Sequence, residues 1–170
     1  MKLKDRILVT LLLTMGLLLH YITPAMFLGM KVDFLLIFII ISIILFPRFD
    51  NYLLVAILGG LFSAMSSTFP GGQIANIIDK LVSTYLILIM VKLAKKQLDK
   101  KLIIAIVGFL GTMASGTIFL ASSKFILGLE GIGMSLVYMV VLPAALINGL
   151  VVAFLYPLVR RVQSLTAQSL

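Results

Sequence analysis

A group of polar and charged side chains interrupts an otherwise apolar part of the chain. The group consists of Asn76, Asp79, Lys80 and Ser83. If a helix begins at about Gly72, these residues follow an i, i+3, i+4, i+7 pattern and share one face, while the opposite face is apolar. A carboxylate and an ammonium on such a helix are costly in lipid unless they pair or line a cavity. Asp79 and Lys80 therefore indicate a functional site, with mutual neutralisation or helix-to-helix attachment as the structural alternative.

The composition indicates where such a helix would lie. The chain has 170 residues, of which 62% are hydrophobic and 12% are charged, and its mean hydropathy is +1.22. A soluble core of this size cannot bury so much apolar surface, so we expect an integral membrane protein. The apolar runs predict an all-α fold, a single domain over residues 1–170 with six transmembrane helices in one bundle. The expected helices are approximately 7–22, 33–46, 52–68, 73–92, 102–123 and 134–159. We expect the second, which is almost uniformly apolar, to face lipid on one side.

The basic residues predict the topology of this bundle. The formal charge is +8, and nearly all Lys and Arg residues fall at alternate helix ends, whereas the other ends hold only Lys31 and Lys124. Short loops rich in Lys and Arg stay in the cytoplasm. We therefore expect a multi-pass protein of the cell membrane with both termini cytoplasmic. This distribution explains the charge without nucleic acid as a partner.

Residues suited to catalysis or metal binding are scarce. The chain has no cysteine, one histidine and six acidic residues, which excludes disulfides and thiolate sites and leaves little material for a metal site. Asp79 has no second aspartate at comparable depth, so we expect no enzyme. The run Gly71-Gly72-Gln73 lacks the Gly-Lys-Ser/Thr ending of a phosphate-binding loop. We therefore expect no cofactor, and any ATP would be bound by partner subunits.

Polar residues in three other places are candidates for the same site. His20, at the outer end of the first helix, either keeps its polar edge at the interface or contributes to substrate binding. Lys31 and Asp33 either cap the second helix, where an aspartate at the start suits the helix dipole, or reach into a pocket. Asn148 in the last helix needs a hydrogen-bond partner in the bundle, and we expect Asp79 or Lys80 to supply it.

Several segments together resemble the bacterial tryptophan transport proteins of the TrpP type. They are Leu19-His20, Gly29-Met30-Lys31-x-Asp33, Leu45-Phe46-Pro47-Arg48, Phe69-Pro70-x-Gly72-Gln73-Ile74-x-Asn76-x-Ile78-Asp79-Lys80 and Leu142-Pro143-Ala144-Ala145-x-x-Asn148. The likeness extends from Arg6 to about Val159. That family in turn is similar to the substrate-binding S-components of energy-coupling factor (ECF) transporters. These are six-helix membrane proteins that work with a transmembrane coupling subunit and two ATPases.

The resemblance implies L-tryptophan as the substrate, and our hypothesis is its uptake from outside into a pocket between the outer halves of the fourth, fifth and sixth helices. Lys80, with Lys31, would bind the carboxylate of the ligand, and Asp79 would bind its ammonium group. The other implied contacts are Asn76, Gln73 or Asn148 for the indole N–H and Phe69, Met30 or Tyr138 for the ring.

One departure from the S-component pattern concerns the first helix. S-components that share a common module often carry alanines four residues apart where they contact the coupling subunit, and the nearest match here is Thr10-x-x-x-Thr14. Association with an ECF coupling subunit and ATPases therefore stands beside a stand-alone, proton-coupled carrier that uses Asp79 or His20. A structural membrane subunit without a ligand is the alternative from another class.

Overall fold

The computed structural model describes residues 3–24, 32–69, 71–128 and 133–168, and these ranges contain helices and no strand. The long helices are α1 (Leu3–Ile22), α2 (Phe34–Leu45), α3 (Phe49–Met65), α4 (Gly72–Ala94), α5 (Lys101–Leu127) and α7 (Leu142–Gln168). The short ones are η2 (Lys95–Gln97), α6 (Met134–Leu136) and η3 (Val137–Val141), a π-helical turn. Since η2 continues α4, and α6 and η3 lead directly into α7, the described residues form six helical segments where six were predicted.

Four of these six segments are long and apolar enough to cross a membrane. They are α1, α4 with η2, α5, and the continuous stretch Met134–Leu165. α2 and α3 are apolar but shorter, with 12 and 17 residues. At ~1.5 Å per residue, α2 spans ~18 Å, less than the ~30 Å hydrocarbon thickness of a bilayer. The chain is thus a multi-pass membrane protein in which the second helix differs from the others.

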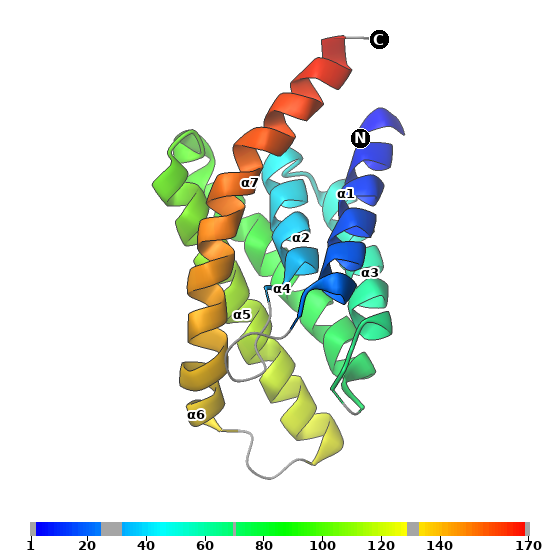
Figure 1. Ribbon diagram of the computed structural model, residues 1–170, viewed down its shortest axis with the longest axis vertical. Helices are drawn as coiled ribbons and strands as arrows, with labels where there is room; N and C mark the ends of the chain where they lie inside the picture. Colours follow the sequence, from blue (N-terminus) through cyan, green and yellow to red (C-terminus); the bar gives the residue numbers. More distant parts are fainter. Residues whose placement is uncertain (1–2, 25–31, 70, 129–132, 169–170) are drawn as a thin grey trace.

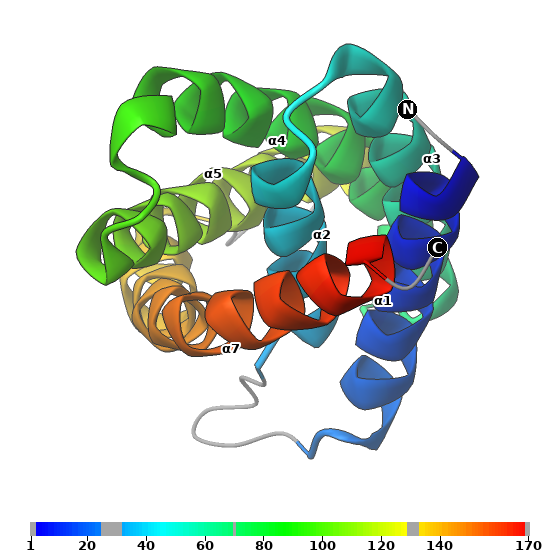
Figure 2. The ribbon, with the colours of Figure 1, turned by 90° about the horizontal axis from the view of Figure 1, so that it is seen from above.

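α2 lies at the centre of the bundle. Viewed from above, the other long helices surround it (Figure 2), and it contacts α1, α3, α4, α5 and α7. Ten consecutive α2 residues, from Leu35 to Ile44, are buried. The expectation that this helix faces lipid on one side is therefore wrong. A helix that is apolar all round is suited to a site where every side is covered, and five neighbours leave no side free.

α4, unlike α2, is buried on one side only, and that side carries its polar residues. Asp79 and Lys80 are only 1% and 2% exposed, whereas Ile74 and Val82 on the other face are 57% and 44% exposed. The helix begins at Gly72, as predicted, directly after Gly71 in the left-handed conformation with φ 72°. An apolar outer face is compatible with lipid, so the α4 pattern agrees with a membrane-embedded bundle.

Two glycines set the approach of α5 to α7. A Cβ atom added to Gly108 would lie 2.9 Å from Gly149 Cα, and one added to Gly149 would lie 2.8 Å from the Ala105 carbonyl oxygen. Small residues at such a crossing let helix backbones pack directly against each other. One turn from this contact, Thr112 on α5 comes to lie opposite Asn148 on α7.

Both chain termini lie at one end of the bundle (Figure 1). In the same view, α3 joins α4 and α5 ends toward the opposite end, whereas α1 ends and α2 begins at about mid-height. The polar residues of α4 lie in its first half, nearer to the end opposite the termini.

Candidate functional site

A cavity of about 390 Å³ opens between α4, α5 and α7 in the half of the bundle opposite the termini. Its polar lining consists of His20, Asp33, Asn76, Asp79, Lys80, Thr112, Ser115 and Asn148, and the rest of its lining is mainly apolar. The last turn of α1, the start of α2, the first half of α4, the second half of α5 and the start of α7 contribute these residues. Five separate elements therefore position the polar groups of one cavity.

The charged pair of α4 is held by a hydroxyl from α5. Lys80 Nζ lies 2.6 Å from Asp79 Oδ2 and donates a second hydrogen bond to Ser115 Oγ at 2.9 Å. Ser115 Oγ in turn donates to Asp79 Oδ2 at 2.8 Å. Neighbouring side chains on a helix point about 100° apart, so the long lysine side chain bends back toward the carboxylate. The result is a compact triangle of a cation, an anion and a hydroxyl.

This triangle satisfies only one oxygen of the Asp79 carboxylate. Among the described residues, Asp79 Oδ1 and Ser83 Oγ have no hydrogen-bond partner of regular geometry, although Ser83 interacts with the carboxylate. A buried acceptor without a partner costs about 1–3 kcal/mol. The free oxygen of Asp79 is therefore the position at which a ligand donor would gain most.

A second pair, His20 and Asp33, lies at the edge of the cavity. His20 Nδ1 is 3.4 Å from Asp33 Oδ1, and the same oxygen accepts a hydrogen bond from Leu36 N at 3.0 Å. Asp33 thus caps α2 and also lines the cavity, so its two expected roles coexist. It interacts electrostatically with Lys80, which places the ammonium under the influence of two carboxylates.

Asn148 links α7 to α2 and α5. Its Oδ1 accepts a hydrogen bond from the backbone N–H of Asp33 at 3.2 Å, and its Nδ2 donates to Thr112 Oγ1 at 3.4 Å. The expected partners, Asp79 and Lys80, are therefore wrong. The crossing of α5 and α7 places Thr112 beside Asn148. Both polar atoms of the Asn148 amide therefore form hydrogen bonds to α5 and to the start of α2 rather than to α4.

A smaller polar hollow adjoins the cavity. It has a volume of about 190 Å³ and shares His20, Asp33, Phe69, Asn76 and Phe119 with the larger one. Its remaining lining residues are the hydroxyl-bearing Ser63, Ser66, Ser67 and Thr68. Ser63 Oγ donates to Asn76 Oδ1 at 2.9 Å, so the end of α3 orients an amide of the larger cavity.

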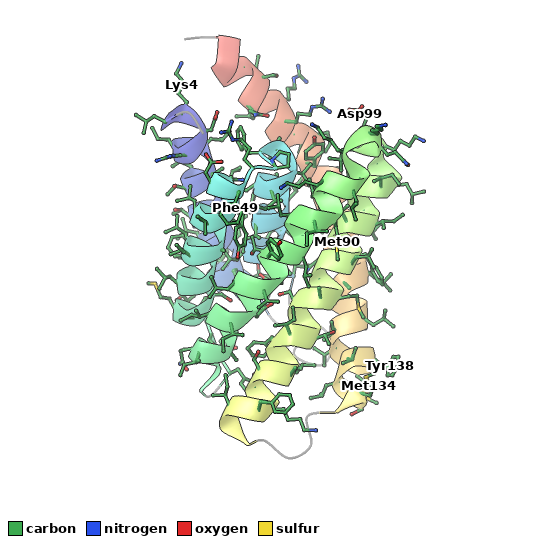
Figure 3. The ribbon with its side chains drawn as sticks, turned by 180° about the vertical axis from the view of Figure 1, so that it is seen from behind. Lys4, Phe49, Met90, Asp99, Met134 and Tyr138 are labelled. Atoms are coloured by element: carbon green, nitrogen blue, oxygen red, sulfur yellow. The ribbon has the colours of Figure 1, made fainter. Side chains whose placement is uncertain are left out.

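Two phenylalanines form an aromatic wall. The Phe69 and Phe119 rings meet edge to face, with centroids 5.6 Å apart and an interplanar angle of 82°, and both line the cavity. Tyr138 does not line it: its side chain is 63% exposed and lies at the outer edge of the bundle (Figure 3). The aromatic surface of the cavity thus comes from the α3–α4 connection and α5.

Five of the remaining sequence candidates lie away from the cavity or outside the described residues. Gln73 is exposed and absent from the lining, while Lys31 and Met30 lie outside the described residues. Thr10 and Thr14 on α1 donate to backbone carbonyls of their own helix, Arg6 and Thr10 respectively, each at 2.9 Å.

Sequence reasoning expected the fifth helix at the pocket but named none of its residues. Thr112, Ser115, Gly116 and Phe119 all line the cavity. They follow the i, i+3, i+4, i+7 pattern that revealed the α4 face. Only Thr112 and Ser115 of the four are polar, and glycines and alanines surround them in the sequence, so this face is less conspicuous than that of α4. No group of three or more metal-ligating side chains occurs within the described ranges.

Comparison with known proteins places this chain in a family. The chain matches the family model for the tryptophan transporter TrpP over residues 2–164. A probable tryptophan transport protein of Bacillus subtilis (strain 168) is 40% identical over 162 residues, which is 95% of this chain and 94% of the relative. Proteins of the same description from Clostridium acetobutylicum and Clostridium perfringens are 37% and 36% identical over 161 and 160 residues. These matches cover 95% and 89% of this chain, and 94% and 88% of the relatives.

No solved structure gives a significant match to this chain. The matched family and these relatives are transporters rather than enzymes. Since the family match covers nearly the whole chain, this protein belongs to the TrpP family of tryptophan transporters.

Proposed function

We propose that this protein binds L-tryptophan in the cavity between α4, α5 and α7 and takes part in tryptophan uptake across the cell membrane. The observation that carries the proposal is the buried Asp79–Lys80 pair on the cavity wall, which offers one anion and one cation to a zwitterion. The family membership of the chain supports the choice of tryptophan.

The charges of the ligand would be divided between the two residues of the pair. Lys80 would bind the carboxylate, and Asp79 Oδ1, which has no hydrogen-bond partner among the described residues, would accept from the ammonium group. Breaking a buried ion pair is costly because one charge is left uncompensated. A zwitterion avoids this cost, since it supplies a partner for each charge that it separates. Ser115 would keep the two side chains in place during the exchange.

The rest of the cavity suits an indole ring. A volume of about 390 Å³ lies within the ~300–1,000 Å³ range of small-molecule sites. Phe69 and Phe119 supply aromatic walls. The side-chain oxygens of Asn76 and Asn148 each accept one hydrogen bond within the bundle. A carbonyl oxygen has a second lone pair, so either amide can accept the indole N–H.

The proposed topology has six membrane passages with both termini in the cytoplasm. The end with the termini carries the basic residues of the helix connections, which favours a cytoplasmic location. α2 can be short because the other helices, rather than lipid, surround it. The serine-rich hollow then faces outward, where it would give tryptophan a polar route past His20 into the cavity.

For the energy source, we propose association with an ECF coupling subunit and its ATPases, so that the chain acts as an S-component-like binding subunit. The exposed apolar stripe on α1, which includes Leu11, Met15 and Leu18, supports contact with another membrane helix as well as with lipid. The His20–Asp33 pair favours the second candidate, a proton-coupled carrier. Co-purification with a coupling subunit would support the ECF assembly. Uptake by the lone protein in liposomes under a pH gradient would support the proton-coupled carrier.

Tryptophan fluorescence provides the test of binding, because the chain contains no tryptophan. We expect purified Asp79→Asn and Lys80→Met proteins to bind at least ~30-fold more weakly, since losing one partner of a buried charged contact costs about 2–5 kcal/mol. The exposed Lys124 gives a control, Lys124→Met, that should bind like the wild type.

The double variant Asp79→Asn/Lys80→Met separates binding from folding. It removes both buried charges, so its thermal stability should exceed that of either single variant while its binding stays weak. Wild-type affinity in both single variants would refute the assignment of the cavity. Failure of the wild type to bind any indole compound saturably would favour the structural-subunit alternative.

A further inference from the structure

A second pocket lies at the other end of the bundle, next to the first turn of α5 and the last turns of α7. Its volume is about 380 Å³, and its charged lining residues are Asp99, Lys101, Arg160 and Arg161. Figure 3 shows Asp99 at the end of the molecule that carries the chain termini. This basic pocket shares no lining residue with the cavity around Asp79, so the proposed function makes no use of it.

The charges of the basic pocket are only partly balanced. Arg160 Nη1 lies 3.1 Å from Asp99 Oδ1, but the side chains of this pair are 55% and 85% exposed. Exposed ion pairs contribute little, about 0–1 kcal/mol, so Arg160 can take another anion at small cost. Lys101 and Arg161 form no salt bridge within the described ranges. Three cations and one anion therefore surround a hollow large enough for a ligand.

The surroundings of the basic pocket indicate an amphipathic anion. Arg160 and Arg161 lie near the end of the apolar stretch Met134–Leu165, which places them at the level of a membrane surface. Leu102 at the start of α5 and Leu158 on α7 are 70% and 53% exposed beside the charged residues. A hydrocarbon chain can follow these apolar side chains while a charged group remains in the pocket.

We propose that the basic pocket binds the phosphate group of an anionic membrane phospholipid. Guanidinium groups pair with phosphate oxygens through two parallel hydrogen bonds, and the adjacent Arg160 and Arg161 supply two such groups. Lys101, from the neighbouring helix, adds a point charge. Basic pockets between transmembrane helices are suited to lipid headgroups of this kind. A bound lipid would connect the start of α5 to the end of α7, far from the tryptophan cavity.

Native mass spectrometry of the full-length protein in detergent tests this assignment. The probes are phosphatidylglycerol and phosphatidylcholine with the same acyl chains, and inorganic phosphate as the soluble competitor. We expect the wild type to retain phosphatidylglycerol selectively. Arg160→Gln/Arg161→Gln should lose about 30-fold in affinity, at about 1 kcal/mol for each basic residue. Lys101→Gln should lose about fivefold by the same reasoning, which keeps the test valid if the double variant does not fold.

The matched control is Lys95→Gln/Lys96→Gln. These two exposed lysines lie near the same end of the bundle and do not line the basic pocket. Both double variants remove two positive charges, so the change in net charge is the same. Their loss should alter the affinity less than twofold. Equal weakening by the control and pocket variants would assign the binding to general surface charge and overturn the proposal. Displacement of phosphatidylglycerol by millimolar inorganic phosphate, or equal retention of phosphatidylcholine, would overturn the choice of a phospholipid.

Discussion

Lys80 on α4 donates a hydrogen bond to Ser115 on α5 at 2.9 Å. The same hydroxyl donates to Asp79 Oδ2 at 2.8 Å, so a neutral residue of one helix fixes both charges of another. The geometry of the buried pair therefore depends on the packing of α4 against α5. This dependence makes α5 part of the binding site that we propose.

Ser115→Ala should weaken both the fold and the binding of tryptophan. The change removes two buried hydrogen bonds to charged groups, at a cost of about 1–3 kcal/mol, and we expect roughly tenfold weaker binding. Ser123, also buried on α5, has no hydrogen-bond partner among the described residues. Ser123→Ala should therefore be neutral or slightly stabilising. Thermal unfolding in detergent and fluorescence titration measure both effects, and equal behaviour of the two variants would contradict a special role for Ser115.

Substitutions of Asp33 should separate its cap from its charge. Asn is as good an N-cap as Asp, whereas Ala loses about 0.5–2 kcal/mol at such a position. We expect Asp33→Asn to keep the cap on α2, which Leu36 N now reaches at 3.0 Å, and to lose the negative charge that acts on His20 and Lys80. Asp33→Ala should lose both and unfold at a lower temperature than Asp33→Asn.

Tryptophan binding by the same two variants measures the role of the Asp33 charge. If the carboxylate helps to hold the ligand ammonium, both variants should bind weakly despite their different stabilities. Wild-type binding by Asp33→Asn would limit Asp33 to the capping of α2.

Phe119→Ala should reduce the affinity for tryptophan, whereas Tyr138→Ala should not. Phe119 lines the cavity and meets Phe69 edge to face, and such aromatic contacts contribute about 0.5–1.5 kcal/mol beyond area burial. We therefore expect a loss of roughly 2- to 10-fold or more for Phe119→Ala. Tyr138 points away from the cavity and provides the aromatic control. A fluorescence titration in which Tyr138→Ala has the larger effect would exclude the Phe69–Phe119 wall as the ring site.

Gly149→Ala should destabilise the bundle at the crossing of α5 and α7. Its added Cβ would lie 2.8 Å from the Ala105 carbonyl oxygen and 3.1 Å from Phe109 N, and backbone atoms cannot move aside as a flexible side chain can. Overpacking of this kind costs about 1–3 kcal/mol. Gly133→Ala is the control, because a Cβ there meets nothing within 4 Å among the described residues. Thermal unfolding of both variants checks the expectation, and an unchanged Gly149→Ala protein would show that the crossing can relax.

The amino-acid sequence was sufficient for several features of this protein. Six helical segments follow from six apolar runs, and the buried face of α4 follows from the spacing of Asn76, Asp79 and Lys80. The start of α4 at Gly72 follows from the Gly71-Gly72 pair, with Gly71 as the N-cap. The segment from Phe69 to Lys80 was specific enough to indicate the family. All of these features are local, since they depend on residues within a few turns of one another.

Only the tertiary structure decided how the helices face one another. α2 is central, Asn148 pairs with Thr112 and the Asp33 backbone, and Ser115 joins the charged pair, while Tyr138 faces outward. In a soluble protein, hydropathy separates the inner side of a helix from the outer side. In a membrane, the lipid side and the packed side are both apolar. The helical pattern thus shows which residues share a face, but the contacts between helices determine where that face points.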